Sequence, residues 1–206
     1  MPSDTDRGRH GYDVVVVGGS LAGCAAARLL ALHGTRVALV EKRPARDAYK
    51  VICTHNIQAG AVPAMERLGV LPALRSAGAV RVQADIWTRY GWIRPPDRGL
   101  RGWNLRRSAL DPIVREQAIG TPGVEYLPGQ TAVGLQGEGR VDGVRVSGSG
   151  GEERLLRARL VVGADGRDSQ LAQMARVPAR VRPHRRFVYF SYFRDVPLAD
   201  PERGMI

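Results

Sequence analysis

Cysteine is scarce in this chain of 206 residues, which contains only Cys24 and Cys53. Two cysteines do not make the framework of a small disulfide-stabilised secreted domain, and a chain of this length can bury a core without one. Long apolar runs are also missing, since stretches such as Val14–Val17 are far shorter than the ~20 residues of a membrane-spanning helix. No charged and apolar leader opens the sequence. We therefore expect a globular protein of the reducing cytoplasm, without a membrane span.

Lysine is nearly absent as well. All but two of the 31 basic residues are arginines, the exceptions being Lys42 and Lys50, and the formal net charge is +11. Blocks of five or more like charges do not occur, and no basic stretch is interleaved with aromatic residues. We therefore expect no nucleic-acid partner, and only a modest attraction for anionic cofactors and substrates.

Glycine, by contrast, is plentiful, and one glycine-rich segment lies near the start of the sequence. The apolar stretch Val14–Val17 runs into Gly18-Gly19-Ser20-Leu21-Ala22-Gly23, a small-residue helix follows, and Glu41 ends the next apolar stretch. This order predicts a strand, a glycine-rich turn, a helix and a second parallel strand. A turn that feeds a helix N-terminus presents free N–H groups to a diphosphate, and the acidic residue can accept ribose hydroxyls. The segment is a dinucleotide-binding signature with serine in place of its second glycine.

A rival interpretation of the same segment is a hydrolase nucleophile elbow. Residues 18–22 nearly spell G-x-S-x-G, with Ala22 in the last glycine position. That interpretation leaves Glu41 without a role, so we favour the dinucleotide site.

The remaining patterns predict an α/β fold: a Rossmann-like domain with a parallel sheet, a β-meander and part of a second, β-sheet domain. The expected elements after Glu41 are an irregular segment 42–54, a helix Gln58–Leu68 ending near Gly69, second-layer strands in Val80–Ile93, a helix Ala109–Ile119 capped by Ser108 with Pro112 in its first turn, an antiparallel meander over Gly123–Ala158, a parallel strand Leu160–Ala164, a short helix near Ser169–Ala175 and an aromatic strand Arg186–Val196.

A second motif follows the apolar strand Leu160–Ala164, where Asp165-Gly166 leads to Ser169. An Asp-Gly pair alone is a turn, as expected for Asp142-Gly143. A carboxylate at the carboxyl end of a buried parallel strand lies at the crevice where open α/β sheets bind ligands, so Asp165 suits a ribose hydroxyl.

Taken together, the N-terminal unit, Arg107 near a helix start and Asp165-Gly166-x-x-Ser169 resemble the FAD-dependent single-component monooxygenases, the para-hydroxybenzoate hydroxylase-like group. The resemblance implies bound FAD, NAD(P)H as co-substrate and oxygen transfer to a small organic substrate, aromatic or polyketide-like. The cofactor-binding residues that it implies are Gly18, Ser20, Leu21, Ala22, Gly23, Glu41, Lys42, Arg43, Arg107, Ala132, Asp165 and Gly166. It identifies no catalytic residue, and Cys53 with His55 does not make a metal site.

The family is longer than this chain and carries a third motif, Gly-Asp before a helix, which is missing here. The resemblance therefore implies an N-terminal half, whose flavin site is completed by a C-terminal half or a companion chain. The expected division is a FAD-binding domain in residues 1–79 and 106–180, substrate-domain strands in 80–105 and the start of a truncated substrate domain in 181–206.

Two other functions stay open at this point. A reductase of the geranylgeranyl reductase type shares these motifs, and a non-catalytic nucleotide-binding fragment that acts with a partner is compatible with the missing third motif. A flavin halogenase is disfavoured, because Trp92-Ile93-Arg94-Pro95 does not reproduce the tryptophan motif of that group.

Overall fold

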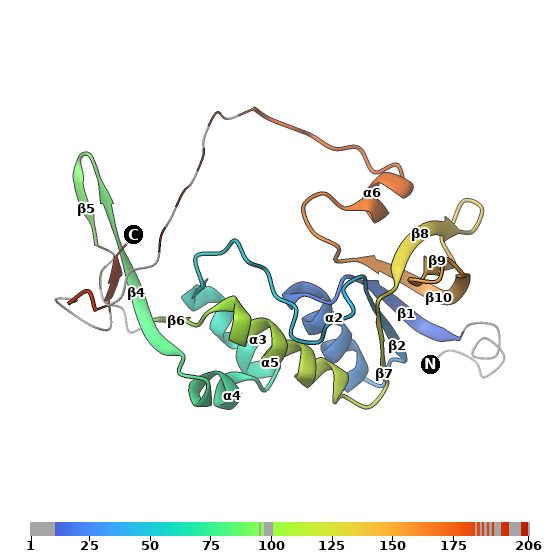
Figure 1. The fold of residues 1–206 in the computed structure, drawn as a ribbon, viewed down its shortest axis with the longest axis horizontal. Coiled ribbons are helices and arrows are strands. Elements are labelled where there is room, and N and C mark those ends of the chain that lie inside the picture. Colours follow the sequence, from blue (N-terminus) through green and yellow to red (C-terminus); the bar gives the residue numbers. More distant parts are fainter. Residues whose placement is uncertain are drawn as a thin grey trace.

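The computed structural model describes residues 11–94, 96, 101–183, 185, 187, 189, 191 and 195–197, and the backbone of 203–205. Two sheets and a group of helices make up this part of the chain (Figure 1). A six-stranded sheet has the order β7-β2-β1-β10-β9-β8; its strands are β1 (Tyr12–Val17), β2 (Val37–Glu41), β7 (Val124–Pro128), β8 (Thr131–Gln136), β9 (Gly143–Ser147) and β10 (Glu153–Gly163).

The second sheet has the order β11-β4-β6-β3, with β5 paired to β4. Its strands are β3 (Asn56–Ile57), β4 (Val80–Thr88), β5 (Gly91–Ile93), β6 (Gly102–Asn104) and β11 (Arg203–Met205). The helices are α2 (Leu21–Leu32), α3 (Val62–Arg67), α4 (Leu71–Ser76), α5 (Arg107–Ile119) and α6 (Gln170–Met174), with a 3-10 turn η1 (Ala59–Ala61) before α3.

The centre of the first sheet is parallel, as the N-terminal pattern predicts. β1 pairs in parallel with β2 on one side and with β10 on the other. Val14 and Val16 pack with α2 and α5, while Val15 and Val17 face a second apolar cluster that includes the meander. This burial on both faces explains the continuous run of valines, since no strand face is left for polar residues. The predicted α/β class is confirmed.

One prediction about the first sheet is wrong, and the strand predicted as Leu160–Ala164 lies in the parallel sheet as expected but as part of a longer strand. β7 does not belong to the antiparallel meander, because it pairs in parallel with β2, Val37 opposite Val124. The meander consists of β8, β9 and the first part of β10, and β10 then continues without a break into the parallel sheet beside β1. Local composition distinguishes strand from turn but does not encode the direction of the partner strand, which depends on where the chain returns.

The helix boundaries also differ from the prediction. α5 begins at Arg107 with Arg106 as its N-cap, so Ser108 lies inside the first turn and Pro112 lies inside the helix. The predicted helix Gln58–Leu68 is divided into η1 and the shorter α3, and α4 was not predicted. Both short helices have proline in their first turn, where a missing N–H costs no hydrogen bond.

The β4–β5 hairpin lies at the opposite end of the molecule from the meander (Figure 1). Its aromatic residues are exposed: Trp87 at 60%, Tyr90 at 83% and Trp92 at 44%. They therefore form neither a sheet core nor a closed pocket in the described part of the chain. The predicted aromatic strand Arg186–Val196 is not formed at the positions that the structure describes, where Phe187 and Tyr189 are exposed and outside any strand; its other positions lie outside the described residues.

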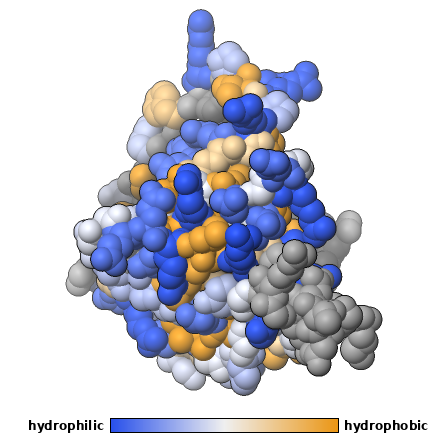
Figure 2. All heavy atoms as spheres, turned by 90° about the vertical axis from the view of Figure 1, so that its right-hand side faces the viewer, coloured by the Kyte–Doolittle hydropathy of each residue, from blue (hydrophilic) through white to orange (hydrophobic). Residues whose placement is uncertain are grey.

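Figure 2 shows the end of the molecule that carries the meander, where hydrophilic side chains predominate and hydrophobic atoms reach the surface between them. Such a mixture is ordinary for a folded protein. Among the helices that the structure describes, none combines the length and apolarity needed to cross a membrane.

Candidate cofactor site

The turn between β1 and α2 requires glycine at two positions. Gly18 has φ +112°, and a Cβ there would overlap the carbonyl group of Ala164. A Cβ on Gly23 would overlap the carbonyl oxygen of Gly18. Since both contacts involve backbone atoms that cannot move aside, the close approach of α2 to the turn depends on these glycines. This is the role that the glycine pattern predicts for them.

The N-terminus of α2 is left open by its own side chains. Ser20 is the N-cap but makes no side-chain cap hydrogen bond, and no acidic residue occurs in the first turn. The first N–H groups of a helix, here those of Leu21, Ala22 and Gly23, have no intrahelical acceptor. They point out of the positive end of the helix dipole, which suits an anion. The Ser20 Oγ instead accepts a hydrogen bond from Arg107 Nη2 at 3.2 Å.

Glu41 joins the end of β2 to this turn. Its side chain is buried, and Oε2 accepts the Gly19 N–H at 2.7 Å while Oε1 accepts the N–H of Arg43 at 2.9 Å and its Nε at 3.0 Å. Burial raises the pKa of Glu41, but the hydrogen bonds from Arg43 and Gly19 outweigh it and the pKa is lowered. The carboxylate is therefore ionised. Because a carboxylate offers about four acceptor positions, one remains for a ribose hydroxyl.

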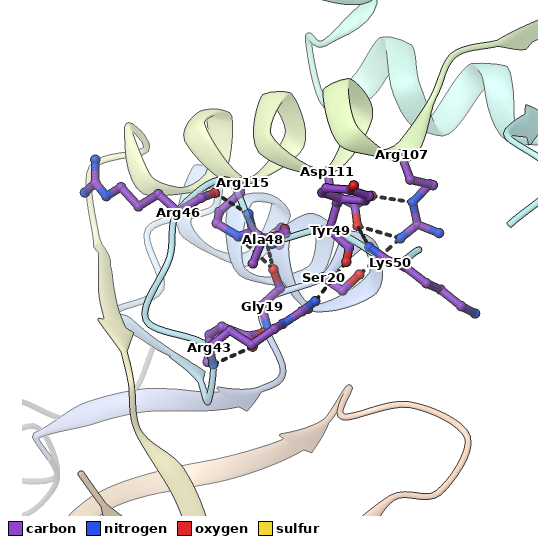
Figure 3. Close-up of polar contacts among 12 residues, drawn as sticks. Gly19, Ser20, Arg43, Arg46, Ala48, Tyr49, Lys50, Arg107, Asp111 and Arg115 are labelled. Atoms are coloured by element: carbon purple, nitrogen blue, oxygen red, sulfur yellow. Dashed lines mark hydrogen bonds and ion pairs between the residues drawn. The ribbon is translucent and has the colours of Figure 1, made fainter. Parts of the chain in front are cut away.

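Three polar side chains lie along one face of α5 and reach the loops beneath it (Figure 3). Arg107 donates to both oxygens of Asp111, including Nη2 to Oδ2 at 2.8 Å, and Asp111 also accepts the N–H of Lys50 at 3.1 Å. Burial lowers the pKa of Arg107, but the hydrogen bonds and charge of Asp111, together with the contact to Cys53, outweigh this effect and the pKa is raised. Arg107 is thus a fixed cation between Ser20 and Cys53, whose Sγ lies 3.7 Å from Nη1.

Arg115 is the third of these side chains and is fully buried. Its Nε donates to Gly19 O at 3.1 Å, its Nη2 to Ala48 O at 2.7 Å, and its Nη1 to Arg46 O. The guanidinium group therefore links the glycine-rich turn to the irregular segment after β2. Neither Asp111 nor Arg115 was predicted. The sequence does contain a pattern that indicates them, because Arg107, Asp111 and Arg115 are spaced by four residues and therefore lie on one face of the helix.

Asp165 follows β10 beside the same turn. A Cβ on Gly18 would lie 2.9 Å from Asp165 N, so the carboxyl ends of β1 and β10 meet there. The exposed carboxylate accepts Ser169 Oγ at 2.6 Å and the Leu171 N–H at 3.1 Å. Partial burial raises the pKa of Asp165, but these hydrogen bonds outweigh it and lower the pKa. Gly166, with φ +101°, makes the turn into α6.

The other predicted residues lie around this cluster. Ala132 is buried in β8, whose start is fixed to Glu41 by a 3.0 Å hydrogen bond from Gln130 N to the Glu41 carbonyl oxygen. Lys42 is exposed. His55 accepts the Arg107 N–H at Nδ1. Across the described residues, no group of three or more His, Cys, Asp and Glu side chains is placed to hold a metal ion.

Comparisons with known proteins agree with this arrangement. The FAD binding domain family matches residues 11–203. The 6-methylpretetramide 4-monooxygenase of Streptomyces rimosus is 33% identical over 174 residues, 81% of this chain and 41% of the relative. Digeranylgeranylglycerophospholipid reductase 1 of Methanothermobacter thermautotrophicus is 30% identical over 180 residues, 83% of this chain and 43% of the relative.

Among solved structures, a variant of PqsL from P. aeruginosa is similar with a TM-score of 0.68 at 25% identity, over 84% of this chain and 48% of that one. The chain spans about two fifths of the length of the two curated relatives. Since the family match extends over nearly all of the chain, and over every residue of the cluster around the α2 N-terminus, the chain belongs to the FAD binding domain family and its cofactor is FAD.

Proposed function

We propose that this chain forms the FAD-binding part of a monooxygenase that uses NAD(P)H and hydroxylates or epoxidises an organic substrate, aromatic or polyketide-like. The observation that carries the proposal is the convergence of an open α2 N-terminus, the ionised Glu41 and the fixed Arg107 on one turn. This set offers N–H donors and a cation to a diphosphate, and a carboxylate to a ribose. The monooxygenase among the relatives supports the type of reaction.

In this proposal each group has one task. The N–H groups of Leu21, Ala22 and Gly23 bind the diphosphate of FAD, Arg107 pairs with a phosphate or flavin oxygen, and Glu41 accepts a ribose hydroxyl. Bound FAD supplies the redox chemistry, while the protein positions it and excludes water. Arg43, Lys42 and Ala132 surround the adenosine end.

Asp165 and Gly166 are proposed to contact FAD from the carboxyl end of β10. Asp165→Ala should weaken FAD retention by about tenfold, because it removes a charged hydrogen-bond acceptor and the contact that begins α6. Equilibrium titration of the apoprotein with FAD, followed by flavin fluorescence, measures the change. The matched control is Asp142→Ala, the other Asp-Gly pair, which lies in the meander turn and should leave the affinity unchanged. Equal affinity of Asp165→Ala and the parent would remove Asp165 from the site.

The three strands β4 to β6, within residues 80–105, are proposed to start a substrate domain, with the exposed β4–β5 hairpin as its outer part. Residues beyond this chain, in a C-terminal half or a companion chain, would complete the flavin and substrate pockets. The chain's coverage of about two fifths of its relatives supports this part of the proposal.

A reductase is the second candidate, favoured by the 30% identity to digeranylgeranylglycerophospholipid reductase 1. A non-catalytic FAD-binding fragment remains the third. One set of measurements separates all three. Purified chain of verified intact mass should be yellow with a flavin absorbance spectrum. Turnover is then measured with the completing half or companion chain present. Oxygen consumed together with NAD(P)H and an oxygenated product indicate a monooxygenase, and product formed without oxygen indicates a reductase. Bound flavin that NAD(P)H does not reduce in this assay indicates a non-catalytic fragment. A chain that binds no flavin contradicts the proposal.

A further inference from the structure

The buried charges around the glycine-rich turn do not cancel, whereas the Asp165 carboxylate beside the turn is exposed to solvent. Glu41 is paired with Arg43, and Asp111 is paired with Arg107. Arg115 is buried behind Gly19, and its guanidinium group reaches only the three backbone carbonyls of Gly19, Arg46 and Ala48. Within the described part of the chain no carboxylate lies within ion-pairing distance of it. Without the exposed Asp165, these paired groups leave one buried positive charge, which belongs to Arg115.

The other titratable groups near Arg115 do not supply the missing negative charge. Burial raises the pKa of the Cys24 thiol to about 12, so the thiol is neutral at physiological pH. Burial likewise raises the pKa of the Tyr126 hydroxyl. A buried cation without a counter-ion is costly, and carbonyl dipoles compensate it only in part.

The position of Arg115 next to the N-terminus of α2 indicates its role. Gly19, which accepts its Nε hydrogen bond, directly precedes Ser20, the N-cap of α2. The uncompensated charge therefore lies behind the open helix N-terminus and adds to the positive end of the helix dipole. An anion bound at the first turn of α2 would be attracted by Arg107, which contacts the Ser20 hydroxyl, and by Arg115, which contacts the Gly19 carbonyl oxygen.

We propose that Arg115 is a positioning residue of the cofactor site. Its buried charge is compensated when the diphosphate of FAD binds, and its three carbonyl contacts hold the glycine-rich turn against residues 46–48. The proposal rests on the FAD-binding role of the site. It gives Arg115 two separable effects: the carbonyl contacts stabilise the fold, and the charge favours ligands with more negative charge.

The test compares ADP with AMP, which differ by about one negative charge at the diphosphate position. The apoprotein is first reconstituted with FAD. Each nucleotide is then added as a competitor, and flavin fluorescence measures how much FAD is released. Arg115→Met and Arg115→Gln should lower the preference for ADP over AMP by roughly three- to tenfold, since a unit charge in a partly buried site changes affinity by about that amount. Arg115→Lys keeps the charge and should keep the preference, although it loses carbonyl contacts and is less stable.

Arg28 provides the matched control. It lies further along α2 and also donates to backbone carbonyls, Leu68 O at 2.8 Å and Gln117 O at 2.9 Å, as well as to Thr121 Oγ1. Arg28→Met should reduce the free energy of unfolding and leave the ADP-to-AMP preference unchanged.

The outcomes are distinct. Equal weakening of ADP and AMP in the uncharged variants, or loss of the preference in a folded Arg115→Lys variant, overturns the proposal and assigns Arg115 a purely structural role. A parent chain that binds no FAD instead overturns the function on which the proposal rests. If Arg115→Met does not fold, Arg115→Gln and Arg115→Lys still decide the question.

Discussion

Replacing Glu41 by alanine is expected to weaken FAD binding by roughly 10- to 100-fold, the effect of losing a hydrogen bond to an ionised group. The loss has two parts. The ribose loses its acceptor, and the Gly19 N–H loses the Oε2 atom that holds it at 2.7 Å. The turn that carries the diphosphate donors is therefore loosened as well.

Titration of the apoprotein with FAD measures this effect. Glu41→Gln keeps the shape of the side chain and should lose less affinity than Glu41→Ala. The matched control is Glu125→Gln in the neighbouring strand β7, where the exposed carboxylate accepts the Tyr12 hydroxyl at 2.7 Å. The proposed site is wrong if both Glu41 variants bind FAD as tightly as the parent.

Glu41 also makes the stability depend on pH. Its pKa in the folded chain lies below the ordinary value of 4.5, so its ionised form is favoured by folding. This contribution is present above pH 4.5 and is lost as the pH falls through the folded-state pKa. In urea unfolding below pH 4.5, the free energy of unfolding of the parent should therefore fall more steeply than that of Glu41→Gln.

Gly23→Ala is expected to have the larger effect on the fold itself. The added methyl group would overlap the Gly18 carbonyl oxygen, and neither backbone segment can move aside without separating α2 from β1. Overpacking of this kind costs about 3 kcal/mol or more, and the displaced helix N-terminus should no longer hold FAD. Urea unfolding and FAD titration measure the two losses.

Gly60→Ala is the control for this substitution. Gly60 lies in η1, and nothing lies within 4 Å of the position that its Cβ would occupy. Its stability and FAD affinity should match the parent. A Gly23→Ala variant with parental stability would mean that α2 does not approach the turn as closely as described.

The β1–α2–β2 unit could be predicted because its signals are local. Each signal depends on the backbone conformation or burial at its own position, and the structure places these residues as the pattern implies: the valine run, Gly18, Gly23 and Glu41. The short helix expected near Ser169–Ala175 is found as α6, and Ser169 caps it by accepting the Ala172 N–H at 3.0 Å.

The contacts of Asp111 and Arg115 could not be predicted in the same way. Polar residues on a helix usually face solvent, and only the position of the irregular segment after β2 turns this face of α5 into a buried one. The start of α5 was missed for a related reason. Ser108 resembles a cap, but the Arg107 N–H receives its acceptor from His55, more than 50 residues earlier.

The uninterrupted course of β10 has a consequence for synthesis of the protein. β1 leaves the ribosome well before β10, so Tyr12 has to wait for Ala158 before that side of the strand is paired. Until β10 has been made, the nascent β1–α2–β2 unit exposes an open valine-rich edge, which is the kind of surface that favours aggregation and engages chaperones. Because so distant a pairing closes the sheet, the nucleotide fold is completed only after the meander has been made, well after its glycine-rich motif.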